Sequence, residues 1–170
     1  MKRVIGVAAA IVAVGVASAA LAQSANVVPG QGLGGFRLGE DLDTIISTLG
    51  PLNTESDLPG GTVRRYFWPL SRIEVFVNRK TKKVTGLVAL YDETYVTEKG
   101  VAAGSEMTAV RTAYGPEETV DSTEDDETLI YDKLGVAFVV DKTGALGGHV
   151  SAIFVFLKGH YRDLFKPPAP

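Results

Sequence analysis

The sequence predicts an α+β fold: a tandem duplication of a helix-plus-three-strand unit, with one antiparallel sheet and the helices on one face of it. Two observations predict this fold. The stretch LGEDLDTIISTLGPL (38–52) has a counterpart, AGSEMTAVRTAYGPE (103–117), at a constant offset of 65 positions. Three strand-like runs follow each copy. We therefore expect repeat 1 over residues 34–98 and repeat 2 over residues 99–158.

The repeated stretch has the pattern of a short amphipathic helix. Its apolar stripe consists of Leu42, Ile45, Ile46 and Leu49 in the first copy and of Met107, Val110 and Tyr114 in the second. We expect the first helix over residues 40–49 and Ser105 as the cap of the second. Gly50-Pro51 and Gly115-Pro116 should end them.

Six strand-like runs follow the helices, three in each repeat. They are residues 63–68, 72–78, 84–91, 128–132, 135–141 and 149–157. In the second run Ile73, Val75 and Val77 should point to one side and Glu74, Phe76 and Asn78 to the other. We expect the first of these sets to face the helices. The runs LVALY (87–91) and AIFVFL (152–157) are apolar on both sides, which predicts central strands or a second face that is also covered.

The glycine, the short helix and the closing Gly-Pro resemble motifs of two related families. These are the SmpA/OmlA-type (BamE-like) outer-membrane assembly proteins and the β-lactamase-inhibitory proteins. The resemblance rests on Gly39, Leu42, Ile45, Leu49, Gly50 and Pro51, and on Gly104, Met107, Val110, Tyr114, Gly115 and Pro116. The tandem arrangement is more similar to the inhibitory proteins. Unlike these families, the chain has no lipid-bearing cysteine and no disulfide pair. The resemblance implies a fold that offers a sheet face to another protein.

The N-terminus has the pattern of a secretory signal peptide over residues 1–22. Lys2 and Arg3 precede an apolar run, and Ala20-Leu21-Ala22 predicts cleavage after Ala22. An uncleaved membrane anchor is the alternative. We expect a periplasmic or secreted protein, a flexible linker over residues 23–33 and a C-terminal tail over residues 159–170 that is loose after Phe165.

Composition excludes several classes of protein. The absence of cysteine excludes a lipoprotein, a disulfide framework and a thiolate zinc site. Without Lys2 and Arg3 the chain has 15 basic and 20 acidic side chains, which disfavours nucleic acid as a partner. The acidic excess lies in the second half, where residues 99–157 hold four basic and ten acidic groups.

No catalytic signature is present in the sequence. The two histidines, His149 and His160, are isolated, and no nucleophile, metalloprotease, phosphate-loop or dinucleotide motif occurs. We therefore predict no enzyme activity, no catalytic residues and no cofactor.

Differences between the two repeats suggest a binding surface. Arginine beside aromatic residues is favoured at protein interfaces. The candidates, which have no chemical counterparts in the second repeat, are Arg64, Arg65, Phe67, Trp68 and Phe76. For Trp68 the alternative is a packing role beside Pro69.

The acidic loop DSTEDDE (121–127) is a weak candidate for calcium through Asp121, Asp125 and Glu127. It lacks the spacing of an EF-hand, so a solvated loop is the alternative and no metal site is predicted.

These patterns favour a non-enzymatic binding module that contacts another envelope or extracellular protein through its sheet face. A small-molecule or calcium-binding envelope protein is the alternative. An enzyme of unrecognised type is the third reading.

Overall fold

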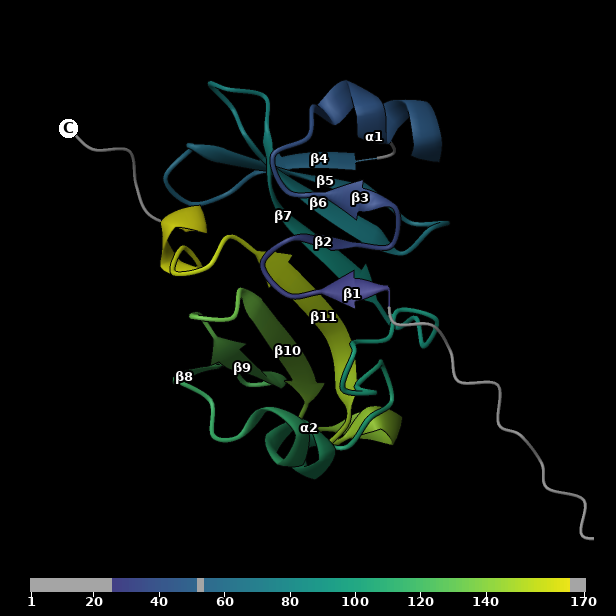
Figure 1. Cartoon of the computed structure of the whole chain (residues 1–170), viewed down its shortest axis with the longest axis vertical. Coiled ribbons are helices and arrows are strands. Elements are labelled where there is room, and N and C mark those ends of the chain that lie inside the picture. The colour runs from purple at the N-terminus through teal and green to yellow at the C-terminus, as the bar shows by residue number, and fades with distance from the viewer. Residues whose placement is uncertain (1–25, 52–53, 166–170) are drawn as a thin grey trace, which may run out of the picture.

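The chain forms a mostly β structure built on one large antiparallel sheet. The computed structural model describes residues 26–51 and 54–165. The strands of the large sheet, from edge to edge, are β4 (Thr54–Asp57), β5 (Val63–Trp68), β6 (Ile73–Asn78), β7 (Val84–Leu90), β11 (Val150–Phe156), β10 (Val136–Asp141), β9 (Asp126–Tyr131) and β8 (Thr119–Ser122). Strands β7 and β11 pair at the centre, so four consecutive strands lie on each side of the midline (Figure 1).

A smaller sheet of three two-residue strands lies over the centre of the large one. Its strands are β1 (Val27–Val28), β2 (Gly32–Leu33) and β3 (Phe36–Arg37). Strand β2 contacts both β7 and β11, and Val27 and Leu33 are fully buried. The flexible linker predicted over residues 23–33 is therefore wrong from Asn26 onward, because two apolar side chains anchor this segment to the core. Residues 23–25 lie outside the described part of the chain.

The α+β duplication of a helix-plus-three-strand unit is also wrong. Each half of the large sheet contains four strands, and the two helices, α1 (Leu42–Leu49) and α2 (Met107–Tyr114), have only eight residues each. The layer that covers the sheet contains the three-stranded sheet as well as the helices. The two missed strands, β4 and β8, lie in the polar connections that follow the helices. Their side chains are largely exposed, so they have no apolar alternation.

Both helices begin and end at positions 65 residues apart. The Leu42 amide donates to the Lys82 carbonyl, and the Met107 amide donates to the Gly148 carbonyl. Helix α1 begins two residues later than predicted, because Asp41 is extended and bridges to Lys83. Ser105 does not cap α2: its hydroxyl accepts the Ala102 amide, and Glu106 is the N-cap residue.

The large sheet is apolar on both faces. We call the face that packs against Ile45 of α1 and Val110 of α2 the helix face, and the other the open face. The helix face contributes Tyr66, Trp68, Ile73, Val75, Val77, Leu87, Leu129, Tyr131, Phe138, Val140, Ile153 and Val155 to one core. The open face contributes Val63, Phe76, Val88, Ile130, Ala137, Ala152, Phe154 and Phe156 to a second core. The alternation in β6 therefore predicted the two faces of that strand correctly.

The C-terminal segment, residues 157–165, covers part of the open face. It contains the short 3₁₀-helix η2 (Arg162–Leu164), and Tyr161 and Leu164 are buried in the second core. The Tyr161 ring lies 5.1 Å from the Phe156 ring and 5.9 Å from the Phe154 ring. The predicted signal peptide and residues 166–170 lie outside the described part of the chain. Among the described helices, none is long and apolar enough to cross a membrane.

Candidate functional site

The open face contains a groove beside the C-terminal segment. Its volume is about 610 Å³, and ligand pockets commonly measure roughly 300–1,000 Å³. The apolar floor extends over β6, β7, β11 and β10 and consists of Phe76, Val88, Leu90, Val139, Ala152 and Phe154. Tyr91, Tyr161 and Phe165 also line the groove. Leu90 and Val139 are the partly exposed members of this floor, whereas Phe76, Val88, Ala152 and Phe154 are at most 5% exposed.

Phe76 and Phe154 form the aromatic centre of the floor. Their rings stack with centroids 4.9 Å apart and planes inclined by 29°. Gly86 on β7 lies between their strands, opposite Phe76 on one side and Phe156 on the other. A Cβ atom at position 86 would lie 2.6 Å from Phe154 Cε2, so only glycine leaves room for this ring. The groove floor thus depends on one small residue in a central strand.

One wall of the groove carries an ion pair. Arg65 Nη1 lies 3.4 Å from Glu74 Oε1, and Arg65 Nε donates to the Ser56 hydroxyl at 3.2 Å. The Glu74 side chain is only 15% exposed, whereas that of Arg65 is 44% exposed. Burial raises the pKa of the Glu74 carboxyl, and the charge of Arg65 offsets part of that increase.

The opposite wall carries hydroxyls and two carboxylates. It consists of Thr123, Asp126, Thr128 and Asp141. Asp126 on β9 lies directly opposite Asp141 on β10 in the ladder. Both side chains are half-buried and both line the groove.

The five predicted binding residues do not form one surface. Phe76 lies opposite Arg65 on the open face, and the alternation of β5 places Phe67 on the same side. Arg64 and Trp68 belong to the helix face. Phe76 is 5% exposed, so it serves as floor and core and not as a protruding anchor. Only Arg65 and Phe76 of the set line the groove.

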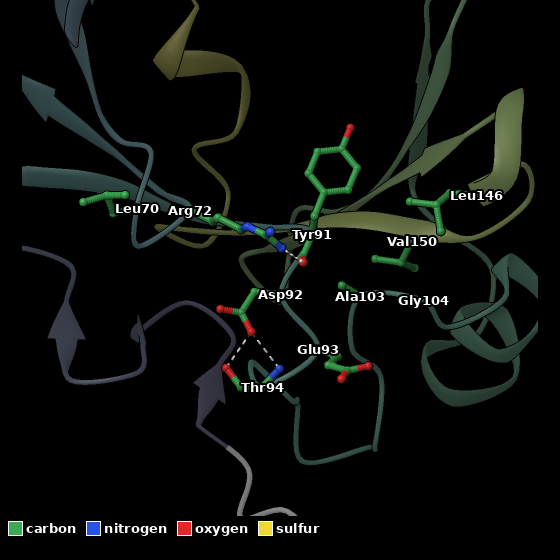
Figure 2. Close-up of a pocket in the computed structure, with 10 residues that line it drawn as sticks. All are labelled: Leu70, Arg72, Tyr91, Asp92, Glu93, Thr94, Ala103, Gly104, Leu146 and Val150. Atoms are coloured by element: carbon green, nitrogen blue, oxygen red, sulfur yellow. Dashed lines mark hydrogen bonds between the residues drawn. The ribbon is translucent and has the colours of Figure 1, made fainter. Parts of the chain in front are cut away.

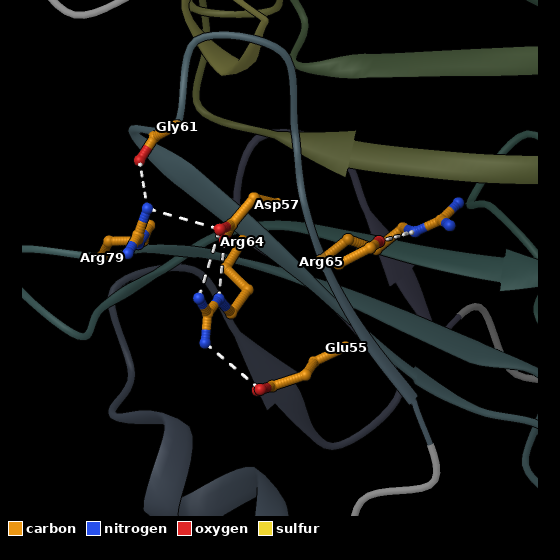
Figure 3. Close-up of polar contacts among 7 residues, drawn as sticks. Glu55, Asp57, Gly61, Arg64, Arg65 and Arg79 are labelled. Atoms are coloured by element: carbon orange, nitrogen blue, oxygen red, sulfur yellow. Dashed lines mark hydrogen bonds and ion pairs between the residues drawn. The ribbon is translucent and has the colours of Figure 1, made fainter.

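Arg64 holds the edge strand β4 in place. Its guanidinium donates from Nε to Asp57 Oδ1 at 2.7 Å, from Nη2 to Asp57 Oδ2 at 3.3 Å and from Nη1 to Glu55 Oε1 at 3.3 Å (Figure 3). Arg79 Nη1 adds a contact to Asp57 at 3.4 Å and donates to the Gly61 carbonyl. The hydrogen bond from Arg64 lowers the pKa of Asp57. All three guanidinium nitrogens of Arg64 therefore donate to carboxylates of β4.

Trp68 has a packing role. It is 2% exposed, and its indole Nε1 donates to the Gly50 carbonyl at 3.1 Å, at the end of α1. In the other half of the sheet, the Tyr131 hydroxyl donates to the Gly115 carbonyl at 2.9 Å, at the end of α2. Each helix end is thus tied to the sheet by one aromatic side chain.

The sequence did not single out the groove residues on β7, β10 and β11. The signal was the apolar character of residues 87–91 and 152–157 on both sides of the strand. It predicted either central strands or a covered second face, and it did not indicate how much of that face is covered.

The acidic loop does not gather its carboxylates. Asp121 lies opposite Thr128 on the open face, 3.8 Å from Arg162, whereas Glu127 precedes Thr128 in the strand and points to the other face. Asp125 lies in the turn between β8 and β9. Within residues 26–51 and 54–165, no three His, Cys, Asp or Glu side chains are grouped so that they could hold a metal ion.

A second pocket, which we call the rim pocket, lies where several strands end. It measures about 540 Å³, and its lining includes Leu70, Arg72, Tyr91 and Leu146 (Figure 2). Leu70 is 97% exposed. Arg72 and Tyr91 have positive φ values of 52° and 49°, and Arg72 Nη1 donates to the Tyr91 carbonyl at 2.8 Å. Tyr91 lines both the rim pocket and the groove.

Neither histidine lines the groove or the rim pocket. His149 Nδ1 lies 3.0 Å from the Gly147 carbonyl, and His160 Nδ1 lies 2.6 Å from Asp163 Oδ2. These contacts are local, within three residues along the chain.

The chain matches no protein-family model and no curated protein. It is similar to a solved structure, that of a cysteine-rich secretory protein (SAV1118) from Staphylococcus aureus subsp. aureus Mu50. The two chains are 14% identical with a TM-score of 0.47, over 83% of this chain and 51% of that one. This chain therefore spans about half the length of the staphylococcal protein, and the likeness is too distant to assign a family.

Proposed function

We propose that the protein is a non-enzymatic binding module that receives an apolar segment of another protein in the open-face groove. One observation carries the proposal: the groove has an apolar floor between two polar walls, and no described element covers it completely. Protein interfaces commonly have this arrangement of an apolar centre with a polar rim.

The size of the groove sets the affinity that we expect. Burying one aliphatic or aromatic side chain contributes about 1.5–3 kcal/mol. Micromolar binding needs about 8 kcal/mol after the entropic cost of association. A floor about four strands wide accommodates two or three such side chains, so we expect affinities near or weaker than micromolar.

Selection from a displayed library of random twelve-residue peptides on the purified protein tests this function. Enriched peptides are synthesised, and their affinities are measured by fluorescence anisotropy. We expect Leu90→Ala, in the groove, to weaken binding about tenfold, which corresponds to about 1.4 kcal/mol. Leu134→Ala removes an exposed leucine outside the groove and is the matched control.

A third variant distinguishes the groove from the rim pocket. If Leu70→Ala weakens peptide binding and Leu90→Ala does not, the rim pocket is the binding surface and the groove is not. If the protein enriches no peptide, the proposed function is wrong. Melting temperatures of all three variants confirm that each is folded.

The groove volume also suits a small apolar ligand, which is the second candidate function. Native mass spectrometry of the protein purified from its own cells distinguishes the two. A reproducible added mass that disappears in Leu90→Ala favours the small molecule.

We further propose that the protein acts outside the cytoplasm, on the strength of the signal-peptide pattern. N-terminal sequencing of the protein from its own cells should then begin at Gln23. A chain that begins at Met1 would contradict cleavage.

A further inference from the structure

We propose that the segment bound in the groove carries a lysine or arginine, held between Asp126 and Asp141. This inference rests on the proposed function and specifies the chemistry of the partner. Asp126 and Asp141 are cross-strand neighbours, and like charges at directly opposed positions of a sheet repel each other. A cation placed between the two carboxylates would offset this repulsion.

Among the described residues, no basic group forms an ion pair with Asp126 or Asp141. The ion pairs of this half of the sheet are Arg111–Glu117, Lys133–Glu118 and Arg162–Asp121. Lys142 is the basic residue adjacent to Asp141 in sequence. Its ammonium group lies at the Thr123 end of this wall, where it donates to the Ser122 hydroxyl and the Thr123 carbonyl and not to either carboxylate.

Arg65 is also too far away. It lies on β5, four strand positions from Asp141 on β10. At about 4.8 Å per strand the separation along the sheet is about 19 Å. That distance exceeds the Debye length of about 8 Å at physiological salt.

A partner segment bound in the groove would increase the cost of leaving Asp126 and Asp141 without a cation. A bound apolar segment removes water from the wall, and a carboxylate that loses water without gaining a partner is destabilised. The penalty selects against a purely apolar segment and favours one with a basic side chain. The acidic excess of this half, four basic against ten acidic groups over residues 99–157, attracts such a segment from solution.

The geometry also sets the spacing within the bound segment. Val139 lies opposite Ala152 on the floor, and Asp141 follows two residues further along β10. Phe154, also on the floor, lies opposite Ala137, which is four residues from Asp141. At about 3.3 Å per residue these distances are about 7 and 13 Å, which match the i to i+2 and i to i+4 spacings of an extended peptide. The basic residue should therefore stand two or four positions from an apolar anchor.

Peptides enriched on the purified protein provide the probes for this inference. We expect lysine or arginine two or four positions from an apolar residue. The double variant Asp126→Asn/Asp141→Asn should bind these peptides at least about tenfold more weakly. The double variant Glu93→Gln/Glu98→Gln makes the same change in charge at exposed sites outside the groove, and its affinity should stay within twofold of wild type.

Two further measurements separate this inference from the proposed function. Replacing the basic residue of the peptide by glutamine should weaken binding to wild type but not to the Asn double variant. If the Asn double variant binds as tightly as wild type while Leu90→Ala loses affinity, the acidic wall is not the recognition element and the groove still is. Enriched peptides that contain no basic residue would also overturn the inference.

Discussion

Glu74 is a carboxylate placed against an apolar floor with one arginine as its partner. Its side chain is 15% exposed, and burial raises its pKa above the ordinary value of 4.5. The folded protein therefore binds this proton more tightly than the unfolded chain does. The stability contributed by the group is complete below pH 4.5 and is lost as the pH rises through the folded-state pKa.

We predict that Glu74→Gln stabilises the protein at pH 7 by up to about 1 kcal/mol, because a buried charge is replaced by a neutral side chain of similar size. The gain should disappear at pH 4, where the wild-type carboxyl is protonated. Urea unfolding at both pH values measures the difference, with the exposed Glu93→Gln as control. A loss of stability at pH 7 would show that the pairing with Arg65 outweighs desolvation.

At the scale of single residues, the alternation in the sequence predicted which face of the sheet a side chain points to, but not how exposed that side chain is. It assigned Val75 and Phe76 to opposite faces of β6, and both assignments are correct. It did not predict that Phe76 is buried, because its cover comes from Phe154 on β11. That contact depends on Gly86 and on the pairing of β7 with β11, which no local pattern encodes.

At the scale of elements, the edge strands β4 and β8 present mostly exposed side chains, whereas the inner strands bury apolar ones. The predicted runs 63–68, 84–91 and 135–141 agree closely with β5, β7 and β10, because these strands bury apolar side chains. Strand β4 buries none, and its four side chains are exposed. Its backbone pairs with β5, and ion pairs from Arg64 and Arg79 add to this attachment. Its position could therefore not be predicted from hydrophobic periodicity.

We predict that Arg64→Gln loosens β4 locally. Amides of residues 54–57 should exchange with solvent faster, because the hydrogen bonds from Arg64 to Asp57 and Glu55 are lost. The melting temperature should change little, since the strand contributes no buried side chain. Hydrogen exchange followed by mass spectrometry measures both halves of the sheet in one experiment.

Lys80→Gln removes an exposed positive charge nearby and is the control for Arg64→Gln. Equal exchange of residues 54–57 in wild type and Arg64→Gln would mean that the backbone ladder alone holds the edge. Faster exchange throughout β5–β7 would mean that Arg64 supports the whole half and not one strand.

At the scale of the whole molecule, the sheet has a core on each face, and the C-terminal segment completes the second one. Tyr161 is 7% exposed and contacts Phe154, Phe156 and Phe165. Burial raises its pKa to about 12, with the charge of Asp121 as a further cause. The sequence predicted order up to Phe165 but gave no indication that this segment packs on the sheet.

We predict that Tyr161→Ala destabilises the protein by about 3 kcal/mol, as expected for the loss of a buried aromatic ring. The variant should also bind more of a dye specific for exposed apolar surface, because the second core is opened. Leu157→Ala removes a side chain that is 43% exposed and should cost no more than about 0.5 kcal/mol. Equal stability of the two variants would show that the segment is not part of the core.

The two outer strands have a consequence for association between copies. An unpaired strand edge is a template on which another chain can add, and charged, short strands prevent this. Strands β4 and β8 have four residues each, read Thr-Glu-Ser-Asp and Thr-Val-Asp-Ser, and present mostly exposed side chains. Both edges of the sheet therefore have features that oppose the lateral addition of another strand.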